Sequence, residues 1–200
     1  MKQRVLLSIL FIFSFLSLAF AQEKENLAKM GLGLEYGNWK PGTLDDNPGN
    51  PFKNVRGAAP YCGLTFVTPS FKNYSLRFSI LQWQQKHLGD RTNKESVTLR
   101  HFSAEIKNLI IAESKIVPYV SYGISAIWSR EVPVGSEREK IPLDRAGYGV
   151  NVGAGVDLQV LEHWAIAAEY QYMYAKFTKK VGLTDNYSGP KISFKVMCLF

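Results

Sequence analysis

Residues 147–160, GYGVNVGAGVDLQV, alternate strictly between apolar side chains and glycine or polar ones. Even-numbered positions carry tyrosine, valine, alanine or leucine, whereas odd-numbered positions carry only Gly, Asn, Asp and Gln. A period of two places successive side chains on opposite faces of an extended strand. In a helix the same residues would scatter round the axis, and the glycines would weaken it. The segment therefore predicts a β-strand with one apolar face and one small, polar face.

The same alternation recurs along the chain and predicts eight strands in all. These strands are expected at residues 29–37, 61–68, 74–80, 97–110, 120–128, 147–160, 164–174 and 191–200. In 61–68 and 97–110 the alternation is less regular, so the inward face of these two strands is undecided from the sequence.

The connections between these strands differ in length in a regular way. Short turns are expected at residues 69–73, 111–117 and 161–163, and long polar loops at 39–56, 85–96, 130–146 and 178–187. Such alternation is typical of an up-and-down barrel whose two ends face different compartments. Closure also removes exposed sheet edges. We therefore expect one all-β domain over residues 22–200, an eight-stranded antiparallel up-and-down transmembrane β-barrel.

Residues 1–21 have the parts of a secretory signal peptide. Lys2 and Arg4 precede an apolar run of 16 residues from Val5 to Phe20, and Ala19-Phe20-Ala21 forms a small-x-small end. The run is shorter than the roughly 20 residues that a helix needs to cross a bilayer. We expect cleavage after Ala21 and export of the chain from the cytoplasm.

Two closed barrels fit the alternation, and they differ in which face is apolar. A soluble periplasmic barrel of the lipocalin kind would line its inside with the apolar set and use it to bind a ligand. A transmembrane barrel would turn that set toward lipid. The small size of the polar set suits the narrow interior of an eight-stranded barrel, and aromatic residues near strand ends resemble interfacial girdles. These aromatic residues are Tyr36, Tyr74, Trp128, Tyr148, Trp164, Tyr174 and Phe200. We favour the transmembrane form and keep the soluble one as an alternative.

The signal-like start, the eight alternating strands and the last strand, Ile192-x-Phe194-x-Val196-x-Cys198-x-Phe200, resemble small bacterial outer-membrane β-barrels. The resemblance is to the OmpA transmembrane-domain, OmpX and opacity-protein type. It implies that Phe200, with Phe194 and Val196, forms the signal read by the barrel-assembly machinery. It also implies a Gram-negative outer membrane with lipids and lipopolysaccharide around the barrel, termini in the periplasm and four long loops outside.

Charged residues occur on the polar faces of the expected strands. Under the predicted register the interior charges are Glu35, Arg77, Asp157, Glu169 and Lys195. Since a buried unpaired charge is costly, we expect these residues to pair with one another. An eight-stranded interior is filled by side chains, so a wide pore is not expected. The expected function is structural or a surface interaction through the loops, such as envelope integrity, adhesion or binding of an extracellular ligand.

A hydrolase is the alternative from another class. His101 and Ser103 lie two residues apart on one strand and Glu105 follows, which supplies the residue types of a nucleophilic triad. Outer-membrane lipid A deacylases are similar in using a His-x-Ser pair, but an Asn follows the Ser in that family whereas this chain has Ala104. We expect no enzyme and no catalytic residue.

Composition excludes several other functions. The formal net charge of +7 is modest, and no nucleic-acid partner is expected. Cys62 and Cys198 fall on the second and eighth strands, which are too far apart for a disulfide, so both are expected to be free thiols. His87 and His163 have no partners at metal-ligand spacing, so no metal or cofactor is expected.

Overall fold

The computed structural model describes residues 29–41, 59–86, 96–110, 115–132, 143–181 and 184–200, and all regular structure in these ranges is β-strand. The strands are β1 (Gly31–Trp39), β2 (Ala59–Val67), β3 (Tyr74–Lys86), β4 (Ser96–Leu109), β5 (Ile116–Val132), β6 (Leu143–Leu161), β7 (Trp164–Val181), β8 (Thr184–Asn186) and β9 (Gly189–Leu199). The described ranges hold no helix long and apolar enough to cross a membrane.

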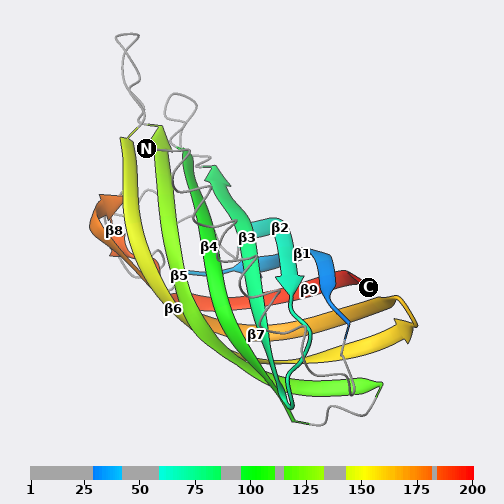
Figure 1. Cartoon of the computed structure of the whole chain (residues 1–200). Coiled ribbons are helices and arrows are strands. Elements are labelled where there is room, and N and C mark those ends of the chain that lie inside the picture. The colour runs from blue at the N-terminus through cyan, green and yellow to red at the C-terminus, as the bar shows by residue number, and fades with distance from the viewer. Residues whose placement is uncertain (1–28, 42–58, 87–95, 111–114, 133–142, 182–183) are drawn as a thin grey trace, which may run out of the picture.

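The strands form one closed antiparallel barrel (Figure 1). Each strand from β1 to β7 pairs with the next, and β9 closes the barrel by pairing with β1 on one side and β7 on the other. The short β8 pairs with β7 alone. The expected eight-stranded antiparallel barrel is thus confirmed, with β8 as an addition.

The prediction of a loop over residues 178–187 is wrong for most of that range. Strand β7 continues to Val181, and β8 follows at Thr184. The side chain of Val181 is buried, and its carbonyl accepts a hydrogen bond of 2.8 Å from the Tyr187 hydroxyl. The polar composition of this stretch predicts a loop, but inward packing of Val181 and Tyr187 extends the sheet.

The barrel has a turn side and a loop side. On the turn side β2–β3 and β6–β7 are joined by short turns, and Met30 and Phe200 exchange two backbone hydrogen bonds of 2.9 Å. The first of these turns is closed between Phe71 and Tyr74, with Lys72 at a φ of 54°. The loop side is the opposite end, where β1, β3, β5 and β7 finish. The connections after β1, β3 and β5 lie mainly outside the described residues.

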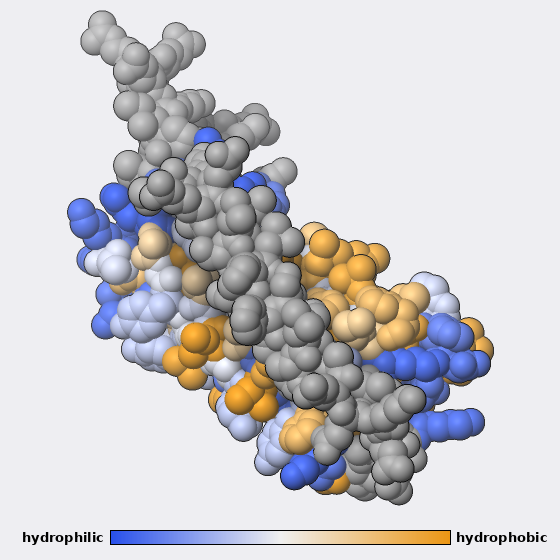
Figure 2. Space-filling model, in the orientation of Figure 1, coloured by the Kyte–Doolittle hydropathy of each residue, from blue (hydrophilic) through white to orange (hydrophobic). Residues whose placement is uncertain are grey.

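The outer wall is apolar over most of its height, whereas much of the inner wall is polar or charged. Figure 2 shows hydrophobic side chains over the visible part of the wall, with hydrophilic ones toward its ends. All seven aromatic residues expected at the girdles face outward, with 46% (Tyr174) to 59% (Phe200) of their surface exposed. The soluble lipocalin-like alternative is therefore wrong, because its apolar set would have to lie inside.

Glycines on the inner wall make room for rings on the neighbouring strand. Gly37 lies directly opposite Tyr61, and Gly155 opposite Tyr119. A Cβ at Gly37 would lie 2.8 Å from the Tyr61 ring, and one at Gly155 would lie 2.6 Å from the Tyr119 ring. Each ring therefore packs against the backbone of a glycine. This close approach lets a narrow barrel hold large side chains in its lumen.

Candidate functional site

The lumen is organised in three layers from the loop side to the turn side. At the loop side thirteen buried residues form an apolar cluster, which we call the aromatic plug. The aromatic plug consists of Trp39, Ala59, Tyr61, Leu81, Trp83, Val97, Leu99, Ile127, Met173, Ala175, Phe177, Val181 and Tyr187. Below it lies a charged layer, defined by Glu35, Arg77, Glu105, Glu169 and Lys195. A partly open cavity, the vestibule, occupies the turn side.

Edge-to-face ring contacts hold the aromatic plug together. The ring centroids of Trp39 and Trp83 are 5.5 Å apart, and those of Phe177 and Tyr187 are 5.4 Å apart. Trp83 also meets Tyr187 at 6.4 Å, so β1, β3, β7 and the segment between β8 and β9 are linked across the lumen. Such pairs contribute about 0.5–1.5 kcal/mol each beyond area burial. The loop-side end of the barrel is therefore filled by packed rings.

Glu169 on β7 is the centre of the charged layer. Its Oε1 accepts hydrogen bonds from an Arg77 Nη at 2.7 Å and from Ser121 Oγ at 2.6 Å. Its Oε2 accepts from the ammonium of Lys195. Both cations and the carboxylate are almost completely buried, so each charge depends on its partners in the low-dielectric interior.

A second carboxylate, Glu105 on β4, shares Arg77 with Glu169. The guanidinium binds Glu105 Oε2 through two nitrogens, with Nε at 3.1 Å. Amide nitrogens complete the shell, with Gln171 Nε2 at 3.1 Å from Oε2 and Asn151 Nδ2 at 3.2 Å from Oε1. Arg77 is thereby held between Glu105 from the adjacent strand and Glu169 from β7, which does not pair with β3.

The network continues from Lys195 to β1 and β2. The ammonium of Lys195 lies 4.0 Å from Glu35 Oε2, and the Tyr61 hydroxyl donates to Glu35 Oε1 at 3.0 Å. Together with Ser121 on β5 and Asn151 on β6, these contacts reach all eight barrel strands. One hydrogen-bonded network thus ties every barrel strand to the others across the lumen.

The five predicted interior charges all lie in the lumen. Glu35, Arg77, Glu169 and Lys195 are in the charged layer, whereas Asp157 lies nearer the turn side and pairs with Lys107. Glu105, Lys107 and Lys191 are interior charges that the sequence reading missed. With these, the charges named in the lumen are four cations and four acids, and Arg145, opposite the buried Ser129, adds a fifth cation on the inner wall nearer the loop side. Most of the interior charges thus lie beside a charge of the opposite sign.

Lys191 lies over an aromatic ring, as Lys107 does over Tyr119 at 4.0 Å. Its ammonium lies 4.8 Å from the centroid of the Tyr61 ring. A cation over an aromatic face is stabilised by about 2 kcal/mol or more where water is excluded. Lys191 thus joins the charged layer to the aromatic plug. Its alternation with Ser193 and Lys195 on the last strand was the sequence signal that could have placed it inside.

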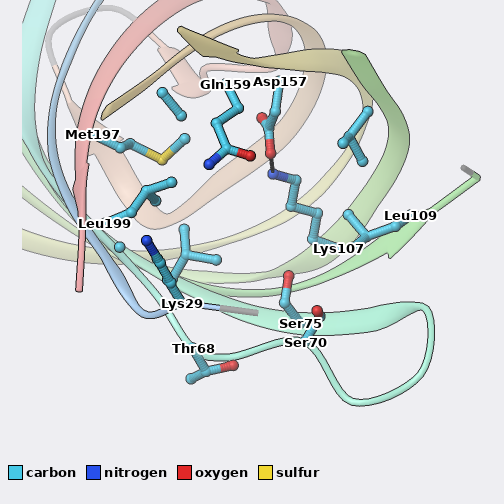
Figure 3. Close-up of a pocket in the computed structure, with 14 residues that line it drawn as sticks. Lys29, Thr68, Ser70, Ser75, Lys107, Leu109, Asp157, Gln159, Met197 and Leu199 are labelled. Carbon is cyan, nitrogen blue, oxygen red and sulfur yellow. Dashed lines mark hydrogen bonds and ion pairs between the residues drawn. The ribbon is translucent and has the colours of Figure 1, made fainter. Parts of the chain in front are cut away.

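The vestibule is a cavity of about 340 Å³ at the turn side, lined equally by polar and apolar residues. Figure 3 shows Lys107 joined to Asp157 on one side, with Met197 and Leu199 across from them. Lys29 at the rim is paired with Glu162 at 3.3 Å. Both lysines that line the cavity are therefore already neutralised by acids of the same chain.

The structure places His101 and Ser103 side by side on the inner wall but does not join them. Both are buried, and among the described residues neither His101 Nε2 nor Ser103 Oγ has a hydrogen-bond partner. Glu105, the third residue of the hypothetical triad, is bound to Arg77. In the described part of the chain, no cluster of three or more His, Cys, Asp or Glu side chains could hold a metal ion.

The remaining predicted residues lie on the outer wall or outside the described ranges. Phe194, Val196 and Phe200 face outward at the β9 end of the chain, with 62%, 49% and 59% of their surface exposed. Cys62 and Cys198 are free, as expected, and lie beside different positions of β1. The predicted signal peptide, residues 1–21, and most of the first three predicted loops are outside the described residues.

Solved structures with the same fold are small outer-membrane barrels. Neisserial surface protein A is 17% identical over 86% of this chain and 96% of its own, with a TM-score of 0.55. Ail, the attachment invasion locus protein of Yersinia pestis in complex with the heparin analogue sucrose octasulfate, is 13% identical over 88% of this chain and 100% of its own, with a TM-score of 0.55. Outer membrane protein W of E. coli is 17% identical over 88% of this chain and 100% of its own, with a TM-score of 0.50. No protein-family model and no curated protein matches the sequence.

Proposed function

We propose that this chain, which has the fold of the small eight-stranded outer-membrane barrels, spans the outer membrane of a Gram-negative bacterium as a closed barrel. Its turn side faces the periplasm and its loop side faces outward. Its role is structural or adhesive and is exercised through the loop-side connections, not through the lumen. The observation that carries the proposal is the reversal of polarity across the wall, with apolar side chains outside and a charged layer inside.

The height of the apolar band supports a membrane-spanning role. On β6 the outward residues from Tyr148 to Val160 are apolar. About 12 steps of about 3.3 Å give about 40 Å along the strand. A tilt of about 40° reduces this to about 30 Å, close to the thickness of the hydrocarbon core.

The filled lumen supports a structural or adhesive role over a pore. The aromatic plug packs the loop side, and the charged layer crosses the middle. A solute would have to break ion pairs whose partners are otherwise buried and unpaired. Ail binds a heparin analogue, and for this chain a surface ligand is proposed to bind through the connections after β1, β3 and β5.

Assembly is proposed to use the end of the last strand. Phe194 and Val196 on β9 and Phe200 just after it lie in one outward row, where a machinery that receives the strand from the lipid side would meet them. Export by a signal peptide over residues 1–21 belongs to the same proposal. Deleting Phe200 should lower the amount of assembled barrel in cells, whereas truncating the outward Ile192 to Ala should not.

We propose no hydrolytic activity. The support is that His101 and Ser103 face a filled lumen and that Glu105 is occupied by Arg77. The purified barrel should leave lipid A acyl chains intact. Deacylation that is lost in Ser103→Ala would contradict this part of the proposal.

The decisive experiment separates membrane barrel from soluble protein. The outer-membrane fraction is run on a detergent gel with and without boiling, and the folded barrel should change its mobility on heating. Planar bilayers that contain the purified barrel should show no large conductance. A protein found in the soluble periplasmic fraction, or large stable channels, would overturn the proposal.

A further inference from the structure

The apolar band on the outer wall is not equally high on all sides of the barrel. On β5 the outward apolar residues run from Ile116 to Trp128, as they do on β6 from Tyr148 to Val160. On β1 the corresponding row runs only from Met30 to Tyr36, and on β3 only from Tyr74 to Ile80. At about 3.3 Å per residue and a tilt of about 40°, the longer rows rise about 30 Å and the shorter rows about 15 Å.

The short rows and the long rows begin at the same end of the barrel. Tyr74 on β3 takes part in the β2–β3 turn, and Val160 on β6 lies next to the β6–β7 turn. The apolar band is therefore a wedge, whose turn-side edge is level and whose loop-side edge falls toward β1–β3. Tilting the whole barrel moves both edges of a face together, so a tilt cannot level a wedge. We call the outward surface of β1, β2 and β3 the thin face.

Polar side chains follow the apolar rows at the loop side of the thin face. On β1 and β3 these residues are Asn38, Gln82 and Gln84, and all three are exposed. The exposed Arg100 on β4 extends this polar edge and donates from Nε to Gln82 Oε1 at 3.0 Å. The register row that passes through Gln82 and Arg100 reaches Trp128 on β5. The wall therefore changes from polar to aromatic between β4 and β5.

A flat bilayer cannot match both sides of this wedge. A bilayer thick enough for β5 and β6 would cover the amides of Asn38, Gln82 and Gln84 with acyl chains. Burying several unpaired amides in hydrocarbon costs more than locally thinning the bilayer. The outer leaflet should therefore sink beside the thin face, where the ester and phosphate oxygens of lipids can accept hydrogen bonds from the amide N–H groups.

We propose that the thin face speeds the movement of phospholipids between the two leaflets. A headgroup that crosses there passes through about half the usual thickness of hydrocarbon, because the apolar rows of β1 and β3 are about half as high as those of β5 and β6. The occupant of the thin face is thus the phospholipid bilayer itself. This proposal rests on the proposed function, because the face can act only on a membrane that the barrel spans.

The test measures lipid exchange in vesicles of phosphatidylcholine that contain the purified full chain. A trace of phosphatidylcholine carries a fluorescent dye on its headgroup, and dithionite added outside destroys the dye in the outer leaflet only. Vesicles without protein should keep the dye of the inner leaflet. Vesicles with the barrel should lose that dye as well, because labelled lipid moves to the outer leaflet.

The decisive variant is Asn38→Leu/Gln82→Leu/Gln84→Leu, which raises the apolar edge of the thin face. We expect lipid exchange to slow about tenfold or more, because less thinning is then needed to match the wall. The matched control, Ala146→Leu/Lys176→Leu, adds leucine above the band on β6 and β7 at exposed positions and should leave the exchange rate unchanged.

A converse variant lowers the band on the opposite side of the barrel. Trp128→Gln/Tyr148→Gln replaces the outward aromatic residues at the loop-side ends of the long rows, which are 52% and 55% exposed. Lipid exchange should become faster in this variant. The heat-dependent gel shift is recorded for every protein, so that each rate belongs to a folded barrel.

Equal exchange by the wild type and Asn38→Leu/Gln82→Leu/Gln84→Leu would overturn the proposal, as would an equal loss in Ala146→Leu/Lys176→Leu. A stable dimer in the vesicles that leaves the inner dye protected would also overturn it, since a second copy would then cover the face. A barrel that shifts on heating but exchanges no lipid contradicts the thin face alone, whereas a protein without the shift contradicts the proposed function.

Discussion

The charged layer and the aromatic plug lie one above the other in the same lumen, yet different forces hold them. In the charged layer, Glu169 forms ion pairs with both Arg77 and Lys195, so removing its carboxylate leaves two buried cations without that partner. In the aromatic plug, rings such as Trp39 and Trp83 meet at 5.5 Å, and loss of one side chain leaves a void but no orphaned charge. A narrow barrel can thus be filled either by charge pairing or by ring packing. Substitutions in the two layers should therefore lower the stability of the barrel by different amounts.

The largest effect is expected from breaking the charged layer at its centre. Glu169→Ala leaves Arg77 and Lys195 without their shared acceptor, and loss of one partner of a buried pair costs about 3–5 kcal/mol. Urea unfolding of the barrel in lipid vesicles measures the change. Glu169→Gln keeps the shape and part of the hydrogen bonding, so it should cost less. An Ala variant as stable as wild type would show that the network is not needed.

A somewhat smaller effect is expected from opening the aromatic plug. Leu81 is 4% exposed, and its truncation to Ala should cost about 2–4 kcal/mol through lost burial and a cavity. The neighbouring Ile80 is 62% exposed on the outer wall and provides the control. Because lipid can fill the space, Ile80→Ala should cost clearly less in the same unfolding assay. Equal costs would mean that the plug is no better packed than the outer wall.

Both layers contain rings that pack against a glycine on the neighbouring strand. Gly147 beside the aromatic plug and Gly155 beside the charged layer each face a ring. A Cβ at Gly147 would lie 2.7 Å from Phe177, and one at Gly155 would lie 2.6 Å from Tyr119. Gly147→Ala and Gly155→Ala should each cost about 1–3 kcal/mol through overpacking. At Gly149 the nearest side-chain atom would be 3.4 Å away, so Gly149→Ala should be the mildest of the three. The opposite order would refute the ring-on-glycine account.

The smallest effect is expected from an ion pair outside the lumen. Lys29 and Glu162 pair at 3.3 Å, but their side chains are 35% and 78% exposed. Lys29→Gln should change stability by about 0.5 kcal/mol or less, because water and salt screen an exposed pair. A loss comparable with that of Glu169→Ala would show that exposure does not explain the difference between the two pairs.

The sequence alone was sufficient for the architecture. Alternation with period two marks each strand and its two faces, as residues 147–160 illustrate, and this local signal needs no knowledge of partners. It assigned Glu35, Arg77, Asp157, Glu169 and Lys195 to the inner wall, and the structure has these side chains in the lumen. Following the same parity past Ile80 would also have placed Leu81 and Trp83 inside.

Only the tertiary structure decided which interior groups meet. Arg77 and Glu169 are 92 residues apart and come from strands that do not pair, so their contact depends on the stagger and closure of the whole barrel. The aromatic plug arises in the same way, from strands brought to one height by register. Local periodicity determines the face on which a side chain lies, whereas the neighbours across a lumen are determined by the closed sheet.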